Sequence, residues 1–167
     1  EAVYQLDAKP PAAPAAGGHV GGVGIPRRLG VPVERLAEIL ARHRYGLVTI
    51  GQIKTPQPRM RLFAELEQQG RCLPPIVSPR AHVSRHAALG VGTIVLHGAV
   101  VNAGAVVGRN CIVNSLALVE HDAVVGDHCH VATGARVNSG VRVGDGSFIG
   151  SGSVVRQGLA IGRNCVI

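Results

Sequence analysis

The sequence contains very few aromatic residues. Tyr and Phe occur twice each and Trp is absent, so aromatics make up 2% of a chain in which 46% of residues are hydrophobic. Large rings normally supply much of a globular core, so this interior must be built from small and β-branched side chains. Four aromatics also offer too few stacking platforms for a single-stranded nucleic acid. The scarcity excludes a ring-filled core and disfavours nucleic-acid binding.

Segments that target or anchor a protein are also lacking. No apolar run is long enough to span a bilayer, and the N-terminus lacks the basic and apolar stretches of a secretory signal. Lys and Arg number 17 against 10 Asp and Glu, which gives a net charge of +7, but no block of them forms a basic tail. We therefore expect a cytoplasmic protein without membrane or nucleic-acid partners, whose charge suits nucleotide or coenzyme phosphates.

The four cysteines do not have zinc-finger spacing. Cys129 stands between His128 and His130, but adjacent residues of an extended chain point to opposite faces and cannot converge on one ion. We expect no metal site and interpret Cys129 as a small buried hydrophobe.

A six-residue repeat fills the second half of the chain. From Val77 to Ile167 every sixth residue is Val, Leu or Ile, and the residue four positions later is usually small. A longer period of eighteen residues places a glycine directly after every third of these aliphatics, at Gly90, Gly108, Gly126, Gly144 and Gly162. A fixed period of this kind is typical of a solenoid.

Six residues with one inward aliphatic and one inward small residue describe one flat side of a narrow coil. Three such sides make a triangular turn of eighteen residues, and coils of a parallel β-helix stack about 4.8 Å apart. A prism this narrow has no room for rings, which explains the rarity of aromatics. We expect the glycines of the longer period to supply the backbone conformation of a corner. Residues 77–167 are therefore predicted to form a mainly β, hexapeptide-repeat parallel β-helix.

Residues 1–76 lack the repeat. Their pattern predicts a strand at 3–6, a loop at 9–30, a helix at 33–44, a strand at 46–51, a helix at 58–69 and a strand at 73–77. Alternation of strand and helix indicates an α/β domain, and this stretch is too short to be a complete one. We place the domain boundary between residues 76 and 77.

The densest polar interruption of the repeat lies at 114–122, where His121 stands between Glu120 and Asp122. An imidazole titrates near neutral pH, and a carboxylate that fixes its tautomer makes it a better general base. The spacing leaves open which of the two acids does so. A solvated turn, in which polar residues serve no reaction, is the competing interpretation.

The hexapeptide array, the segments 113–122 and 126–131 and the lead-in at 50–81 resemble bacterial sugar acyltransferases. The subfamily includes sialic acid O-acetyltransferases and the N-acetyltransferases of nucleotide-linked amino sugars such as bacillosamine and perosamine. Its most specific motif here is Glu120-His121-Asp122 with His130 nine residues after the first histidine. The resemblance covers 46–167 and implies a left-handed β-helix, a homotrimer that binds acetyl-CoA between subunits, and a Rossmann-like N-terminal domain that holds a nucleotide sugar.

The resemblance also implies roles for individual residues. His121 would be the general base that deprotonates an attacking amine or hydroxyl, and Asp122 the acid that polarises it, with Glu120 completing the catalytic set. His130 would contact the thioester carbonyl and Asn114 the acceptor sugar, in a direct attack without a covalent enzyme intermediate. Negative charge on the carbonyl oxygen needs a donor, which is either His130 or a backbone N–H.

Two further substrate contacts are expected nearer the N-terminus. Asp7 would end the second strand of the nucleotide domain, where an acid meets the ribose or base, although Ala8 follows it where the subfamily usually has a second acid. Gly51 is expected beside the substrate. We do not expect the first strand and phosphate loop of that domain in this chain, and Ile167 begins a repeat that stops, which predicts further coils beyond it.

Acetyl-CoA is the expected co-substrate. Besides His130, the residues expected to bind it lie on the later coils: Ser139, Arg136, Arg142 and Arg156. The arginines suit coenzyme phosphates, and ordinary solvated arginines are the alternative.

N-acetylation of a nucleotide-linked amino sugar is our first functional hypothesis, and sugar O-acetylation is the second. Zinc-dependent γ-type carbonic anhydrases share the solenoid but carry a histidine pair five residues apart, and Gly126 stands five residues after His121. A structural or surface-binding solenoid without catalysis would repeat one outward residue in ranks. Here the outward His, Glu, Asp and Asn residues cluster instead, which favours an enzyme.

Overall fold

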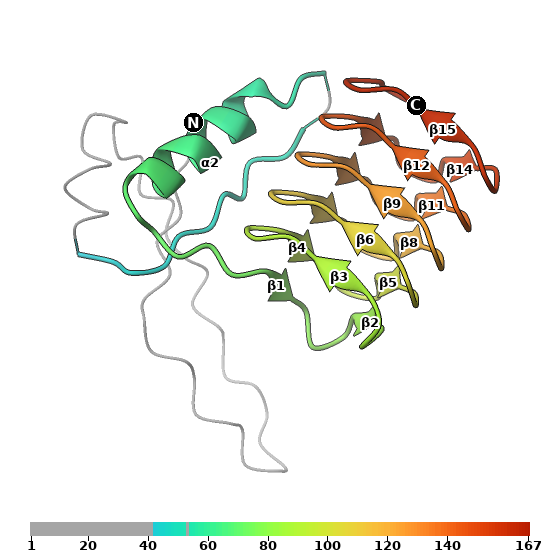
Figure 1. Cartoon of the computed structure of the whole chain (residues 1–167), viewed down its shortest axis with the longest axis horizontal. Helices are drawn as coiled ribbons and strands as arrows, with labels where there is room; N and C mark the ends of the chain where they lie inside the picture. Colours follow the sequence, from blue (N-terminus) through green and yellow to red (C-terminus); the bar gives the residue numbers. More distant parts are fainter. Residues whose placement is uncertain (1–41, 53) are drawn as a thin grey trace, which may run out of the picture.

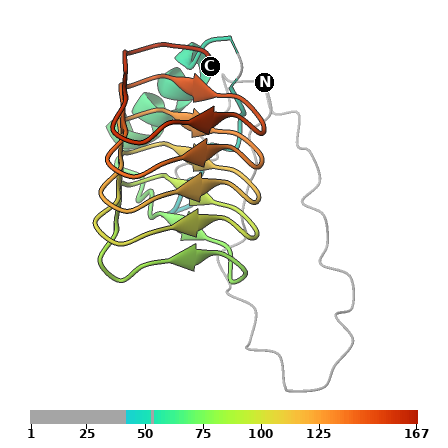
Figure 2. The same cartoon turned by 90° about the vertical axis from the view of Figure 1, so that its right-hand side faces the viewer.

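A computed structural model describes residues 42–52 and 54–167. From residue 76 onward the chain forms a parallel β-solenoid, with its coils stacked one above another in Figure 2. Every strand is two residues long, and the strands make three parallel sheets of five. These sheets are the three faces of a prism (Figure 1).

The faces are numbered in chain order. Face 1 contains β1 (Ile76–Val77), β4 (Ile94–Val95), β7 (Ile112–Val113), β10 (His130–Val131) and β13 (Phe148–Ile149). Face 2 contains β2 (His82–Val83), β5 (Val100–Val101), β8 (Leu118–Val119), β11 (Arg136–Val137) and β14 (Val154–Val155). Face 3 contains β3 (Ala88–Leu89), β6 (Val106–Val107), β9 (Val124–Val125), β12 (Arg142–Val143) and β15 (Ala160–Ile161).

The predicted register is confirmed. Each strand pairs with the strand eighteen residues later, as Val95 does with Val113 and Val113 with Val131. The six-residue column of aliphatics points inward, and from Val95 to Ile149 its members are 0 to 3% exposed. The small residues of the second column fill the space between them, so the prism has an apolar core without aromatic rings. The hand of the coil stays a prediction.

The corners are built differently from our expectation. From Gly92 to Asn164 every sixth residue has a positive φ, and most of these positions are glycine. The exceptions are Asn110, Leu116, Asp122, His128 and Asn164. Asn, Asp and His adopt this conformation more readily than other residues with a Cβ. Asp122, with its positive φ, is one of these corner residues and follows His121 directly in the chain.

The glycines of the eighteen-residue period do not supply that conformation, because they are not among the positive-φ residues. Four of the five, Gly90, Gly108, Gly126 and Gly144, are required by close approach between coils. A Cβ on Gly90 would lie 2.5 Å from the backbone nitrogen of Arg109, and one on Gly144 would lie 2.7 Å from that of Arg163. Our prediction of their role was therefore wrong, since the coils meet too closely there for any side chain.

The predicted helix at 58–69 is present as α2 (Gln57–Gln68). Pro56 precedes it and Gly70, with φ +66°, follows it as a terminating glycine. The helix packs along the corner between faces 3 and 1 (Figure 1). Pro56 at its start lies near Gly146 of a late coil and Phe63 lies near Gly92 of an early coil, so the helix runs antiparallel to the direction in which the coils stack. α2, the helix of the described residues, lacks the length and apolarity needed to cross a bilayer.

Two predicted strands before the solenoid are wrong or shortened. Residues 46–51 form no strand, and the nearest pairing is an isolated bridge between Tyr45 and Cys72. The apolar run instead packs Val48 against α2 and Leu73, a burial that periodicity does not distinguish from a strand. The strand predicted at 73–77 is reduced to β1, since the prolines before it have no N–H to pair.

The remaining N-terminal predictions lie outside the described residues. They include the strand at 3–6, Asp7, the loop at 9–30 and most of the helix at 33–44, of which the described residues 42–44 are not helical. The α/β character of the N-terminal region stays a prediction.

Candidate active site

His121 lies at the corner between faces 2 and 3, two residues after the end of β8. Its Nδ1 is 2.9 Å from Asp122 Oδ2. A carboxylate can only accept, so Nδ1 carries the proton and Nε2 is left as an acceptor. The hydroxyl of Ser139, one coil further along the same corner, donates to this Nε2 over 2.9 Å. The three side chains thus form a continuous chain from acid to imidazole to hydroxyl.

The His121 side chain is open to solvent, with 58% of its surface exposed, and Asp122 is 73% exposed. The hydrogen bond to the Asp122 carboxylate raises the pKa of His121, and the charges of Asp122 and Glu120 act in the same direction. An exposed imidazole held by an acid is suited to take a proton from a bound molecule.

Glu120 makes different contacts from those of Asp122. Its Oε2 accepts hydrogen bonds from Asn102 Nδ2 at 2.9 Å and from the His121 backbone N–H at 3.1 Å. These bonds lower the pKa of Glu120, with the bond from Asn102 making the larger contribution, and keep the carboxylate ionised. Of the two acids that the sequence left open, Asp122 therefore contacts the imidazole ring, and Glu120 fixes the backbone beneath it.

His130 occupies a different environment, on face 1 at β10. It is 8% exposed, and Phe148 packs edge-on against its ring with centroids 5.2 Å apart. Its Nδ1 lies 3.0 Å from the carbonyl oxygen of Gln52, and its Nε2 lies 3.2 Å from Asn114 Nδ2. Burial lowers the pKa of His130, so the ring is neutral at neutral pH.

A buried guanidinium anchors the segment that covers His130. Arg59 of α2 is 1% exposed and donates to Gln52 Oε1 at 2.6 Å, to the carbonyl of His128 at 2.6 Å and to the carbonyl of Asn110. Gln52 in turn donates to the carbonyl of Gly146 at 2.7 Å. Desolvation lowers the pKa of Arg59, and carbonyl oxygens in place of a carboxylate compensate its charge.

Arg59 and Gln52 were not predicted as site residues from the sequence. A signal for Arg59 was present, because it stands at the i position of an i, i+3, i+4, i+7 apolar stripe completed by Leu62, Phe63 and Leu66. A charged residue within such a stripe indicates a buried partner. Gln52 gave no comparable signal.

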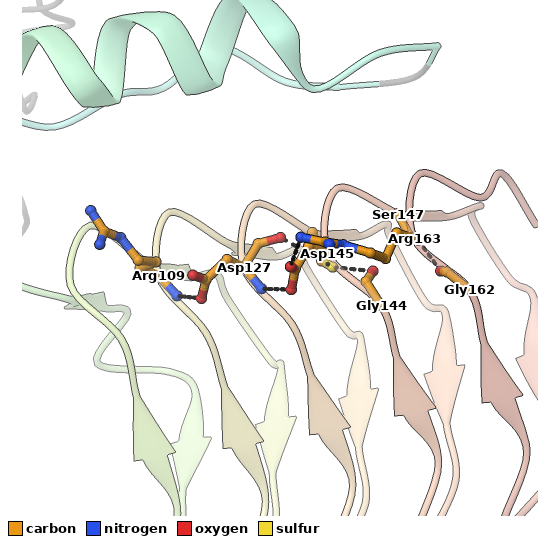
Figure 3. A network of polar contacts seen from close by, with 8 residues as sticks. Arg109, Asp127, Gly144, Asp145, Ser147, Gly162 and Arg163 are labelled. Atoms are coloured by element: carbon orange, nitrogen blue, oxygen red, sulfur yellow. Dashed lines mark hydrogen bonds and ion pairs between the residues drawn. The ribbon is translucent and has the colours of Figure 1, made fainter.

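A ladder of polar contacts follows the corner between faces 3 and 1 (Figure 3). The backbone N–H of Arg109 donates to the carboxylate of Asp127, and the backbone N–H of Asp127 donates to the carboxylate of Asp145, each over 2.9 Å and eighteen residues along the chain. The Arg163 guanidinium pairs with Asp145 at 2.7 Å. Inside it, the thiol of Cys129 donates to the carbonyl of Gly144 over 3.3 Å. Cys129 is buried as predicted, and the ladder serves coil stacking.

The arginines expected to bind coenzyme phosphates lie around the corner that carries His121. Arg136 is exposed on face 2 and Arg142 on face 3, both one coil after His121, and Arg156 is exposed at the corner itself one coil further. Among the described residues, none of the three pairs with a carboxylate. Three free cations thus surround the C-terminal side of this corner.

The structure does not bring all predicted site residues together in one chain. Asn114 follows β7 at the corner between faces 1 and 2, so one whole side of the prism, roughly 20 Å at the rise of a strand, separates it and His130 from His121. Gly51 is exposed beside Gln52, and Asp7 is outside the described part. Within residues 42–52 and 54–167, no group of three His, Cys, Asp or Glu side chains is placed to hold a metal.

No protein-family model matches the chain, and a search of curated proteins finds no relative. Solved structures do match. The acetyltransferase domain of PglB from Neisseria gonorrhoeae is 32% identical over 68% of this chain and 56% of its own, with a TM-score of 0.66. In complex with acetyl coenzyme A, that domain matches at 29% identity over 78% of this chain and 64% of its own, with a TM-score of 0.73. This chain thus spans less than two thirds of those structures.

PerB from Caulobacter crescentus, in complex with CoA and GDP-perosamine, is 26% identical over 81% of this chain and 75% of its own, with a TM-score of 0.61. Another matching structure from the same organism carries the description perosamine N-acetyltransferase. The resemblance indicated by the sequence motifs is therefore confirmed in three dimensions.

Proposed function

We propose that this chain transfers an acetyl group from acetyl-CoA to the amino group of a nucleotide-linked amino sugar. Its solenoid is similar to those of the PglB acetyltransferase domain in complex with acetyl coenzyme A and of PerB in complex with CoA and GDP-perosamine. The observation that carries the proposal is the Asp122–His121 pair: an exposed imidazole whose Nδ1 proton is fixed by a carboxylate and whose unprotonated Nε2 is a hydrogen-bond acceptor. Similarity to the PglB domain and to PerB supports the two substrates.

In the proposed reaction His121 Nε2 removes a proton from the acceptor amine as the nitrogen attacks the thioester carbonyl carbon. A C–N bond forms and the C–S bond breaks. The proton then passes from the imidazolium to the departing sulfur, so that free CoA and the amide are the products. Asp122 stabilises the transient imidazolium, and Glu120 keeps the backbone of the corner in place.

Coenzyme phosphates would lie toward the C-terminal coils. Arg136, Arg142 and Arg156 surround that side of the His121 corner and pair with no carboxylate of residues 42–52 or 54–167, so they are available to phosphate oxygens. Ser139, which donates to His121 Nε2, would release the imidazole when the acceptor binds.

We further propose a homotrimer with its sites between subunits. Within one chain, His121 lies at one edge of face 2 and the Asn114–His130 pair lies at the other edge. They can therefore act on the same substrate molecule only if two copies of the chain meet. Closed cyclic symmetry gives every copy the same neighbour and completes every site in the same way.

The test measures CoA release from acetyl-CoA with nucleotide-linked 4-amino sugars, and with free sialic acid as a hydroxyl acceptor, together with the mass of the product. We expect CoA release that requires an amino sugar, a product heavier by one acetyl group, and loss of both with His121→Ala. Acetylation of the sialic acid hydroxyl alone would assign the O-acetyltransferase activity instead. Failure to acetylate either class would favour a non-catalytic solenoid and overturn the proposal.

A further inference from the structure

The tautomer of His130 follows from its neighbours. Its Nδ1 is 3.0 Å from the Gln52 carbonyl oxygen, which can only accept, so Nδ1 must carry the hydrogen. The backbone N–H of Gln52 also points at this atom, as a donor at 3.4 Å, and would need a bare Nδ1. The shorter contact decides the tautomer, because a bare Nδ1 would face the carbonyl lone pairs at 3.0 Å and because an Nε2 hydrogen would face the Asn114 amide nitrogen. In a neutral ring Nε2 is then an acceptor.

The orientation of the Asn114 side chain is fixed independently. Its Oδ1 accepts a hydrogen bond of 2.7 Å from the backbone N–H of Ser115, so its Nδ2 is the atom that faces His130. One N–H of this amide donates to His130 Nε2 over 3.2 Å. The amide nitrogen has a second hydrogen, and Asn114 is part-exposed at its corner.

We infer that the second N–H of Asn114, and not His130, is the donor to the thioester carbonyl oxygen, and that His130, Gln52 and Arg59 are positioning residues that aim it. A ring with its hydrogen on Nδ1 presents no N–H at Nε2, so it cannot donate to a developing oxyanion from that side. The inference rests on the proposed acetyl transfer and assigns one step of it. When the attacking nitrogen adds to the carbonyl carbon, Asn114 stabilises the negative oxygen without giving up a proton, until the C–S bond breaks.

The positioning chain starts in α2. Arg59 donates to Gln52 Oε1 at 2.6 Å, and Gln52 donates to the carbonyl of Gly146 at 2.7 Å. These two side-chain bonds hold the Gln52 backbone against the solenoid, and the Gln52 carbonyl holds His130. The segment before the solenoid thereby sets the direction of a side chain that lies on the solenoid.

The first experiment needs no activity. Histidine labelled with ¹⁵N in the full chain reports the tautomer of each ring by NMR, and His130→Gln identifies the His130 signals. We expect a neutral His130 with its hydrogen on Nδ1 at pH 7. A hydrogen on Nε2, or a charged ring, would overturn the inference even if acetyl transfer is observed.

Gln52→Ala tests the positioning chain with the same readout. Loss of the side-chain bonds to Arg59 and Gly146 should loosen the covering segment and move part of the His130 population to the Nε2–H form. Gln68→Ala is the matched control, because Gln68 is exposed at the end of α2 and should leave the tautomer unchanged. An unchanged tautomer in Gln52→Ala would remove Gln52 and Arg59 from the chain.

Kinetics then separate Asn114 from His130. Asn114→Ala should lower kcat by about 10²–10³-fold, as loss of one oxyanion donor does, and His130→Ala by roughly tenfold through misaligned Asn114. The double variant should match Asn114→Ala alone, because His130 acts only through Asn114. If the two losses multiply, His130 contacts the substrate itself and the inference is wrong. If no acceptor is acetylated by the unmodified chain, the proposed function fails while the NMR result stands on its own.

Discussion

His121 and His130 are nine residues apart in the sequence and lie in opposite surroundings. His121 is exposed at a corner, bound to a carboxylate on one side and a hydroxyl on the other. His130 is buried on a face beneath a segment from before the solenoid, bound to a carbonyl and an amide. Both rings carry their hydrogen on Nδ1, so the difference lies in the charge of the partner and in access to solvent.

Those two differences move the pKa values in opposite directions. The Asp122 carboxylate raises the pKa of His121, while burial lowers the pKa of His130. A base must exchange protons with its substrate, which only the exposed ring can do. A positioning residue must keep one protonation state, which burial ensures. The same side chain thus serves chemistry at one place and geometry at the other.

His121→Ala should break the comparison most strongly. Removing the general base should lower kcat by roughly 10²–10⁴-fold, whereas the melting temperature should change little because the side chain is exposed. The measurement is CoA release at saturating substrates beside a thermal melt. His86→Ala is the control, since this exposed histidine lies at the same corner two coils earlier. Full activity in His121→Ala would show that another group is the base.

Asp122→Asn tests what raises the pKa of His121. Asn tolerates the positive φ of 60° at this position, so the corner should keep its shape while the ring loses its carboxylate. We expect kcat to fall roughly 10- to 100-fold, less than at a buried triad aspartate because Asp122 is exposed.

The pH profile of Asp122→Asn shows in which direction the carboxylate shifts the pKa of His121. Activity requires neutral His121 and rises with pH through its pKa, so lowering that pKa should move the acidic limb of the profile to lower pH. Glu120→Gln should move the limb less, because Glu120 does not contact the ring. A limb that stays in place in Asp122→Asn would contradict the assignment.

Mixing defective chains should show whether the two corners cooperate across subunits. His121→Ala and Asn114→Ala chains, co-expressed, should assemble sites that take an intact His121 from one copy and an intact Asn114 from its neighbour. In randomly mixed trimers about a quarter of the sites are of this kind, so activity should recover to that fraction of the unmodified protein. Trimers without recovery would place both residues in one site of a single chain.

The solenoid could be predicted from the sequence because its information is local. The aliphatic at every sixth position fixes what points inward, and the eighteen-residue period fixes which strands pair. The contact between His121 and Asp122 is likewise a matter of neighbours in the chain. By contrast, the glycines of the longer period were assigned the wrong role, since sequence alone does not tell a positive φ from a close approach between coils.

The buried polar network could not be predicted, because its bonds join segments far apart in the sequence. Gln52 meets His130 and Gly146, and Arg59 meets Asn110 and the carbonyls at 128 and 129. The eighteen-residue period links Asn110, His128 and Gly146 to one another, but no period links them to Gln52 or Arg59. They are brought together only when α2 docks along the corner of the stacked coils.

The smallest expected effect concerns the pH dependence of folding stability, to which the two histidines contribute in opposite directions. Burial lowers the pKa of His130 and of His128 in the folded chain below the value of about 6.5 that a histidine has in the unfolded chain. As the pH falls below about 6.5, the unfolded chain therefore binds more protons at these positions than the folded chain does. Stability contributed by neutral His130 is therefore full above that pH and is lost as the pH falls below it. His121 behaves in the opposite way, since its raised pKa favours the folded state on acidification.

We expect the melting temperature to fall as the pH decreases from 7.5 to 5, less steeply in His130→Gln and more steeply in His121→Asn. Gln at position 130 can still donate to the Gln52 carbonyl and accept from Asn114, so the variant keeps the contacts and removes only the titration. His128, which lies against Phe63 with centroids 5.8 Å apart, retains its own share of the slope. Equal slopes in the two variants would mean that the histidines do not differ in environment, and the division between chemistry and geometry would lose its physical basis.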